Sequence, residues 1–402
     1  MITAGRAEWR ALMRDGRGRI LLAVAVPWGL LLGARMALPV LLPFIQSEFD
    51  LRLSTAGLLV TLLWLGSAIG QLPGGVLADR QSEGRLMAVS VGLVALALAA
   101  VVLAPTVVVI FIVIPVWGFA MSLYPIARIT ILSEVYPERL GSALGITMAT
   151  GDLGQTLIPP VAGALAVMVV WQAGLGVVIP ALLLAGLVIW YLVPDSSPAD
   201  PSDDRGLLST IRVVSGEFRR PPMVFMSGIL VLFFFFWQAF TALYPTYLVV
   251  EKGLSPSMAS VLFGLFFAAG AVVKPVAGMA YDRIGMRWAL IGVLVGPVVG
   301  LVGLPIVDGV VLLLGATLAI STMLGNGAVT QSFVAEQFPS EMQGTGLGVI
   351  RTVSAVIGSS GPVVFGVVAE RGFFDEGYIM LAIILMIVIL LTYKMPESTE
   401  LQ

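Results

Sequence analysis

Seven ionisable side chains interrupt the long apolar stretches of this sequence, and their types suit the binding of an anion. Asp152 is the one deep anion, whereas Glu134 and Glu336 lie near the ends of their stretches. The four others are cations: Arg35, Arg128, Lys274 and Arg351. Charges at membrane depth are costly without a partner and therefore mark candidate functional sites. The positive excess favours an anionic ligand, because a guanidinium binds carboxylate or phosphate through two parallel hydrogen bonds and lysine adds a point charge.

These charges stand out because the chain is otherwise strongly apolar. Of its 402 residues, 58% are hydrophobic and 11% charged, whereas soluble domains carry about 25% charged residues. Because a membrane span needs about 20 apolar residues, the sequence predicts an all-α membrane protein with twelve transmembrane helices. They are expected at 20–44, 54–78, 86–104, 107–134, 142–166, 170–193, 223–249, 257–281, 287–306, 310–335, 344–369 and 377–394.

Two further features narrow the class of protein. The arginine-rich start (Arg6 to Arg19) precedes an apolar run that continues to about Ile45 without a small-residue cleavage site, so we interpret this run as the first span rather than a signal peptide. The chain has no cysteine and no histidine, which disfavours zinc sites and imidazole chemistry. With no nucleophile–base set either, we expect no enzyme activity, no metal and no cofactor.

One sequence motif occurs twice and reveals a duplication. GVLADRQSEGR covers 75–85 and GMAYDRIGMR covers 278–287, so that Gly278 follows Gly75, and Asp282 follows Asp79, by 203 positions. Other glycines and prolines keep the same offset, which is close to half the chain length. Such self-similarity fixes the architecture. We predict two pseudo-symmetric six-helix bundles, 1–193 and 223–402, joined by a linker at 194–222.

The distribution of positive charge predicts the orientation. With the N-terminus inside, the cytoplasmic segments hold fifteen lysines and arginines, and the outer segments hold three, namely Arg52, Lys252 and Arg371. Such a bias sets topology. We therefore expect both termini to be cytoplasmic, in the plasma membrane of a prokaryote.

Twelve helices in two homologous halves, with the Gly-x-x-x-Asp-Arg motif after the second and eighth spans, resemble the major facilitator superfamily. The second copy keeps the family's Asp-Arg-x-Gly-x-Arg spacing, whereas the first contains Ser82 and Glu83 in addition. The resemblance implies that the motif forms a cytoplasmic gate, with each aspartate facing a helix N-terminus of the other half. The alternative is a loop that only fixes topology through its charges. The gate residues would be Gly75, Asp79, Arg80, Arg85, Gly278, Asp282, Arg283 and Arg287.

The same resemblance bears on the deep charges. In this superfamily the first, fourth, seventh and tenth helices, with the second, fifth, eighth and eleventh, line a central cavity, and all five deep charges fall on such helices. Lys274 and Arg351 resemble the cations of the oxalate-formate antiporter group, with the two identities exchanged. Arg35 resembles the first-helix arginine of symporters for organic acids. The seventh span has no arginine, which disfavours a phosphate ester, and Ile114 replaces the arginine typical of proton-coupled drug antiporters.

Each of these residues also has a structural interpretation. Arg128 could pair with Asp152 or Glu134 and only join helices, and Arg351 could reach the membrane interface. Asp152 is a candidate proton carrier, because burial raises the pKa of a carboxyl. Coupling residues would be Asp152, Glu134 and Arg128. Substrate-binding residues would be Arg35, Lys274 and Arg351, supported by Gln238, Tyr124 and Asn326.

The sequence thus predicts an alternating-access secondary transporter for a small organic anion, with a carboxylate favoured, working by proton symport or anion exchange. The two bundles would rock around a midplane site. Efflux of apolar or cationic compounds is the alternative, and a sensor with this fold is a third. The expected partners are the small-molecule substrate, protons and the lipid bilayer, with no nucleic acid and a monomeric state.

Overall fold

The computed structural model describes residues 12, 17–80, 82–194, 221–337 and 343–396, and every regular element within them is a helix. Side chains are outside the description for several residues in 72–80 and 335–347. The first repeat contains α2 (Arg17–Phe49), α3 (Leu53–Arg80), α4 (Glu83–Val102), α5 (Val107–Ser122), α6 (Tyr124–Val135), α7 (Leu140–Met168), α8 (Trp171–Gly176) and α9 (Val178–Leu192). The second contains α11 (Pro221–Val250), α12 (Pro256–Gly303), α13 (Val310–Ser321), η2 (Thr322–Gly325), α14 (Asn326–Glu336), α15 (Gln343–Gly358), α16 (Gly361–Glu370) and α17 (Phe374–Lys394).

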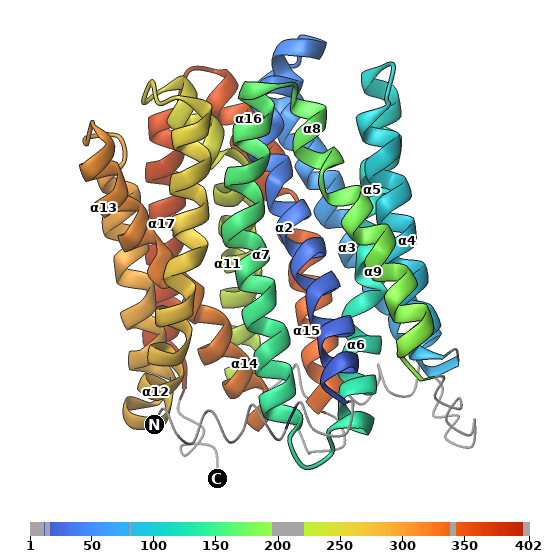
Figure 1. Cartoon of the computed structure of the whole chain (residues 1–402). Helices are drawn as coiled ribbons and strands as arrows, with labels where there is room; N and C mark the ends of the chain where they lie inside the picture. Colours follow the sequence, from blue (N-terminus) through green and yellow to red (C-terminus); the bar gives the residue numbers. More distant parts are fainter. Residues whose placement is uncertain (1–11, 13–16, 81, 195–220, 338–342, 397–402) are drawn as a thin grey trace. The chain divides into compact units, whose positions relative to one another are not determined.

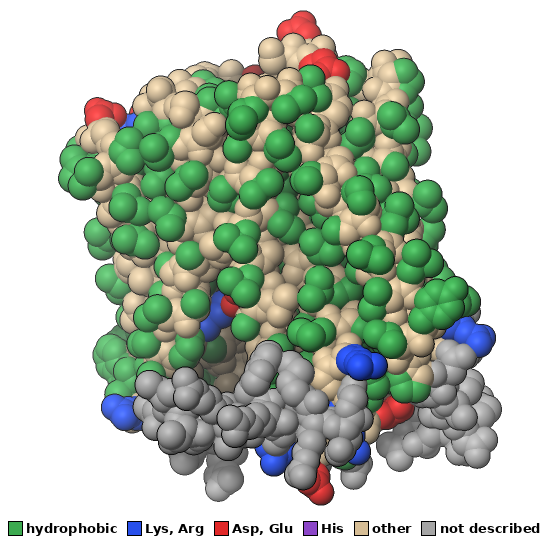
Figure 2. Space-filling view, in the orientation of Figure 1, with side chains coloured by type: hydrophobic (Ala, Val, Ile, Leu, Met, Phe, Trp, Pro, Cys, Tyr) green, Lys and Arg blue, Asp and Glu red, His purple; other side chains and the backbone are tan. Residues whose placement is uncertain are grey.

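These helices provide twelve membrane spans, as the sequence predicts. Ten stretches of the described chain are long and apolar enough to cross a membrane. The other two spans are α7, which is less apolar because it carries Asp152, Gln155 and two prolines, and the second part of α12. On the face shown in Figure 2, hydrophobic side chains cover the helices along their length and most charged side chains lie near helix ends.

The eighth and ninth spans form one continuous element, where the sequence predicts two helices at 257–281 and 287–306. Helix α12 runs for 48 residues and changes direction at Gly285, whose φ of 76° and ψ of 170° are not helical. Glycine adopts this conformation at little steric cost because it has no Cβ. Pro115, Pro159 and Pro275 do not end a helix, since each lies inside one.

The helix breaks follow the duplication. The fourth span is divided at Leu123, between α5 and α6, and Pro125 then occupies the first turn of α6, a position that tolerates proline. In the tenth span, the 3₁₀ segment η2 leads into α14 at Asn326. Leu123 and Asn326 are 203 positions apart, which is the repeat offset. Interrupted helices at corresponding positions of two repeats are typical of transporter binding sites.

The chain folds into two compact units. The first comprises Met1–Ile45 with Leu65–Ala199, and the second Gln46–Trp64 with Asp200–Gln402. The second unit therefore includes the first turns of α3. The predicted linker falls almost entirely on 195–220, which lies outside the described residues.

Helix α4 is central to the first unit, where it packs against α5 and α9 (Figure 1). Helices α2 and α7 approach each other closely through glycines. A Cβ on Gly29 would lie 2.7 Å from the Thr150 carbonyl oxygen, and a Cβ on Gly154 would overlap the Gly29 backbone. Small residues at a helix interface allow such backbone contact inside a membrane.

The second unit has an aromatic core. Phe240 of α11 stacks on Tyr244 at 4.7 Å between ring centroids and contacts Phe266 of α12 at 5.4 Å. Tyr244 also shares a 2.5 Å hydrogen bond with the Thr317 hydroxyl of α13. Helix α12 packs against α13 and α17 (Figure 1).

Candidate functional site

The first unit surrounds Arg128 with polar and aromatic groups. Arg128 is 7% exposed, and its Nη1 donates a 2.9 Å hydrogen bond to the Thr147 hydroxyl of α7. Its guanidinium carbon lies 4.3 Å from the centre of the Trp28 ring of α2, within the range of a cation–π interaction. Trp28 in turn stacks on Tyr124, with 6.0 Å between ring centroids and 13° between planes. A hydroxyl and an indole ring therefore contact this buried cation, and the Tyr124 ring stacks on the indole.

Backbone geometry places these partners. The break at Leu123 puts Tyr124 at the start of α6, where its hydroxyl donates a 2.7 Å hydrogen bond to the Val24 carbonyl of α2. Trp28 fits against α7 because Gly151 has no side chain; a Cβ there would lie 2.8 Å from Trp28 Nε1. The Arg128 cluster, defined as Arg128, Trp28, Tyr124 and Thr147, thus joins α2, α6 and α7.

The partners of Arg128 differ from those that the sequence suggests. Within the described residues its contacts are Thr147 and Trp28, not the carboxylate of Asp152 or Glu134. Asp152 is half-buried and accepts a 3.4 Å hydrogen bond from Gln155 Nε2 on the next turn of α7. Glu134 is exposed near the end of α6. The cation–π contact takes the place of the expected ion pair, since an indole face also stabilises a desolvated guanidinium.

Arg35 lies on the same face of α2 as Trp28. The two residues are seven positions apart, which is close to two helical turns, and Arg35 is half-buried. Asp152 directly follows Gly151, on which Trp28 packs. The first unit therefore brings Tyr124 and Arg128 into contact with Trp28, and it places Arg35 two turns further along the same helix.

In the second unit, Arg351 differs from every other deep cation. It lies on α15 two turns after the first residue, and its side chain is exposed. It has no hydrogen bond, ion pair or ring contact with the residues that the structure describes. One turn further along α15, the Ala355 carbonyl accepts a 3.4 Å hydrogen bond from Gln238 Nε2 of α11. Gln238 is therefore positioned against the part of α15 that carries Arg351.

The chain segments that carry Lys274 and Asn326 pack on each other. Lys274 is half-buried on α12, one turn after Gly270. The η2 segment packs on this part of α12, since a Cβ on Gly325 would lie 2.6 Å from Ala277 Cβ and 3.3 Å from Val273 Cγ1. Asn326 follows directly and is buried; its Oδ1 has no hydrogen-bond partner within the described chain. The Oε1 atom of Gln238 is likewise without one.

The two copies of the Asp-Arg motif are described to different extents. Gly75, Asp79 and Arg80 are part of α3, but their side chains lie outside the described residues. Arg85 is exposed at the start of α4. In the second copy Asp282 and Arg283 are exposed, whereas Arg287 is half-buried and donates a 2.7 Å hydrogen bond from Nη2 to the Met395 carbonyl. The surroundings of Gly278 are open, because a Cβ at this position would meet no atom of the described chain within 4 Å.

Sequence reasoning missed Trp28 and Thr147. Thr147 is one of many hydroxyls in the spans and offers no signal of its own. Trp28 directly precedes GLLLG (29–33), and the Gly-x-x-x-Gly pattern predicts a close helix contact in membranes. This pattern could have indicated that Trp28 faces another helix.

Comparisons with known proteins identify the family. The model of the Major Facilitator Superfamily matches residues 28–362 and again 253–401. The chain is 26% identical over 273 residues to a hexuronate transporter of Bacillus subtilis, an alignment that covers 65% of this chain and 63% of that protein, less than two thirds of its length. It is 23% identical over 352 residues to a cis,cis-muconate transport protein of Acinetobacter baylyi, covering 84% of each.

Solved structures agree on the fold. A nucleoside transporter superposes with a TM-score of 0.82 at 14% identity, covering 94% of this chain and all of that chain. At such low identity the match concerns the fold alone. Because the family model covers most of the sequence and the arrangement of helices agrees with it, the chain belongs to the Major Facilitator Superfamily of membrane transporters.

Proposed function

We propose that this protein is an alternating-access secondary transporter for a small organic anion, with a carboxylate as the favoured substrate. The deep cations outnumber the deep anions, and an anionic substrate would supply the missing charge. Two relatives carry the names of transporters for hexuronate and cis,cis-muconate, and both of those compounds are carboxylates.

The environment of Arg351 carries this proposal. An arginine at membrane depth is retained against a large desolvation cost only when it faces a cavity or a partner. Arg351 is exposed and makes no polar contact with the described chain, whereas Arg128 is already held by Thr147 and Trp28. A carboxylate can pair with such a guanidinium in a two-pronged geometry. Arg351 is therefore the residue we assign first to the substrate.

The remaining roles follow from type and position. Lys274 and Arg35 would add positive charge for the substrate, and Gln238 and Asn326 would hydrogen-bond to it. Asp152, supported by Glu134, would carry a proton if transport is by symport. The two Asp-Arg motifs would act as cytoplasmic gates. By the distribution of lysine and arginine, both termini would be cytoplasmic, in a prokaryotic plasma membrane.

Thermal unfolding of the purified protein with a panel of compounds tests the substrate class. Hexuronates, muconate, neutral sugars and lipophilic cations would be compared, since a ligand at 100 times its Kd stabilises the folded state by about 2.7 kcal/mol. We expect carboxylates to raise the midpoint for the wild type and not for Arg351→Gln. Arg371→Gln is the matched control, because Arg371 is an exposed arginine at the end of α16. Stabilisation by lipophilic cations alone would contradict the proposal and favour efflux.

A further inference from the structure

Helix α3 begins at a residue that cannot cap it. The Arg52 carbonyl accepts the first helical hydrogen bond, from the Ala56 amide, so Arg52 occupies the N-cap position. Its side chain has only donors. The equivalent residue of the second repeat, 203 positions later, is Ser255, whose hydroxyl caps α12 by accepting a 3.3 Å hydrogen bond from the Met258 amide. The free N–H groups at the start of α3 therefore need an acceptor from elsewhere.

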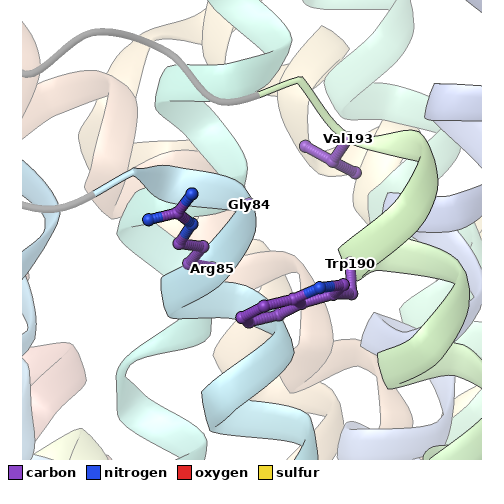
Figure 3. Close-up of a pocket in the computed structure, with 4 residues that line it drawn as sticks. All are labelled: Gly84, Arg85, Trp190 and Val193. Carbon is purple, nitrogen blue, oxygen red and sulfur yellow. The ribbon is translucent and has the colours of Figure 1, made fainter.

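The start of α4 shows a helix that supplies its own cap. The Ser82 hydroxyl accepts a 3.4 Å hydrogen bond from the Arg85 amide, so no other span is needed at this N-terminus. Figure 3 shows this part of α4, where Gly84 and Arg85 line a small pocket with Trp190 and Val193 at the end of α9. Helix α3 differs because its acceptor comes from a distant part of the chain.

That acceptor is Glu370, the last residue of α16. Its Oε2 atom accepts a 3.3 Å hydrogen bond from the Ser54 amide and another from the Ser54 hydroxyl. Arg52 Nη1 lies 3.5 Å from Oε1, but Arg52 is exposed and exposed ion pairs contribute little. A carboxylate is unfavourable at the C-terminal end of its own helix and favourable at the N-terminal end of another. The contact with α3 therefore accounts for a carboxylate at this position.

The capping is reciprocal. Ser360, the N-cap residue of α16, makes no side-chain capping hydrogen bond within the described chain. Instead, the Thr61 hydroxyl of α3 accepts a 3.2 Å hydrogen bond from the Val363 amide in the first turn of α16. Each of these two helices thus supplies the acceptor for the other's N-terminus. We name Ser54, Thr61, Val363 and Glu370 the α3–α16 latch.

Glycines bring the two helices into backbone contact over the same turns. A Cβ on Gly57 would overlap the Pro362 carbonyl, and a Cβ on Gly366 would lie 2.6 Å from the Leu53 carbonyl oxygen. Small residues permit such an approach in a membrane. Residues 46–64 accordingly belong to the second compact unit, with α16, although the duplication assigns them to the first six-helix bundle.

The two repeats differ at both positions of this contact. Val167 of α7 precedes Glu370 by 203 positions, just as Arg52 precedes Ser255. Where a helix carries its own serine cap, the residue equivalent to Glu370 is a valine, which has no acceptor. Where the cap position holds arginine, that residue is a carboxylate. The acceptor has therefore moved from the helix itself to another span in the first repeat.

We propose that the α3–α16 latch holds the first turns of α3 on the second unit and has to open in each transport cycle. The inference rests on the proposed alternating access, in which the bundle 1–193, with α3, rocks against 223–402, with α16. Opening deprives both helix starts of their acceptors, so the latch favours the conformation in which α3 and α16 touch. Glu370 is thus a positioning residue that sets the balance of conformations and does not contact the substrate.

Paired spin labels measure this balance. The chain has no cysteine, so labels attach only where cysteine is introduced. Leu58→Cys on α3 and Val311→Cys in the first turn of α13 are exposed positions of the second unit. Double electron–electron resonance on the full-length protein in lipid nanodiscs gives the distribution of distances between them.

We expect Glu370→Ala to raise the ratio of the long-distance to the short-distance population about tenfold, the equivalent of one charge-assisted hydrogen bond. Glu376→Ala is the matched control, because Glu376 is an exposed carboxylate in the first turn of the next helix, α17. Its ratio should equal that of the parent protein. An unchanged or lower ratio in Glu370→Ala would overturn the latch.

Gly366→Val distinguishes a wrong latch from a wrong transport mechanism, because it forces the helices apart without removing the carboxylate. A higher ratio in Gly366→Val but not in Glu370→Ala would overturn the latch and leave alternating access standing. If neither variant raises the ratio, the contact does not open and both proposals fail. Should Glu370→Ala not fold, Ser54→Ala provides the test: it removes the hydroxyl donor and should raise the ratio, and an unchanged ratio would overturn the latch.

Discussion

The two copies of the duplicated loop began as one sequence and now have different structures. In the second copy, Gly285 turns the chain inside α12 with a positive φ, and Arg287 ties the following span to the end of α17. In the first copy, α3 ends at Arg80 and α4 begins at Glu83, with Ser82 as its N-cap. Here Gly84 is a helical residue at a close helix contact rather than a turn.

The difference shows how a small change in spacing redistributes roles within a motif. The first copy has two more residues before its glycine, Ser82 and Glu83, and one residue fewer between the glycine and the final arginine. Ser82 then caps the new helix start, because its hydroxyl accepts the 3.4 Å hydrogen bond from the Arg85 amide. Arg85 and Arg287 remain equivalent in sequence, yet one lines a pocket and the other closes the same position. Pseudo-symmetry in sequence therefore does not imply identical chemistry in the two halves.

The largest expected difference in stability is between substitutions of the two motif glycines, Gly285 and Gly84. Gly285→Val forces a β-branched residue into a region that only glycine adopts readily, and should cost about 3 kcal/mol of stability. Gly84→Ala is the matched control and should change stability by less than about 1 kcal/mol, since the gain in helix propensity opposes the close contact with Val193. Unfolding of both variants in mixed micelles measures the difference. Similar losses in both would mean that the two copies adopt the same turn.

The second-largest difference in stability is expected between substitutions of the two equivalent arginines, Arg287 and Arg85. Arg287→Gln removes a hydrogen bond from a charged, half-buried donor to the carbonyl of the buried Met395 and should lower the free energy of unfolding by about 1.5 kcal/mol or more. Arg85→Gln should change the free energy of unfolding by less, about 0.5 kcal/mol, because Arg85 is exposed and exposed substitutions usually have small effects. The same micelle assay compares them. A larger loss for Arg85→Gln would reverse the assignment of which arginine joins the helix ends.

The smallest effect on stability is expected for Ser82, the N-cap of α4. Ser82→Ala removes the N-cap acceptor of α4 and should cost about 0.5–1 kcal/mol. Ser82→Asp keeps an acceptor at the same place and should restore most of this stability. If the alanine and aspartate variants unfold alike, Ser82 does not cap α4 in solution.

Much of the architecture is predictable from sequence because it depends on local patterns. The predicted fourth span is 107–134, and α5 with α6 covers Val107–Val135. The twelve spans and the family follow from apolar runs and the repeated motif. The continuous α12 is not predicted, because a glycine between two apolar runs fits a loop as well as a single kinked residue.

The contacts of the charged residues at membrane depth are harder to predict from sequence. Arg128 meets Trp28, which is 100 positions away, and such a contact depends on how α2 and α6 pack. From sequence alone, an ion pair between Arg128 and Asp152 is the simpler expectation, because the attraction between opposite charges does not require a particular helix packing. The roles of Arg35, Lys274 and Arg351 in substrate binding remain predictions, since they depend on a ligand.

Uptake into proteoliposomes tests the central claim most directly. Wild type, Arg351→Gln and Arg371→Gln would be reconstituted and supplied with a hexuronate, cis,cis-muconate or an uncharged hexose. The proposal predicts uptake of at least one carboxylate and none of the hexose. It also predicts a loss of about tenfold or more in Arg351→Gln, the equivalent of one charge-assisted hydrogen bond, with uptake kept in Arg371→Gln. Equal carboxylate uptake by wild type and Arg351→Gln would contradict the account.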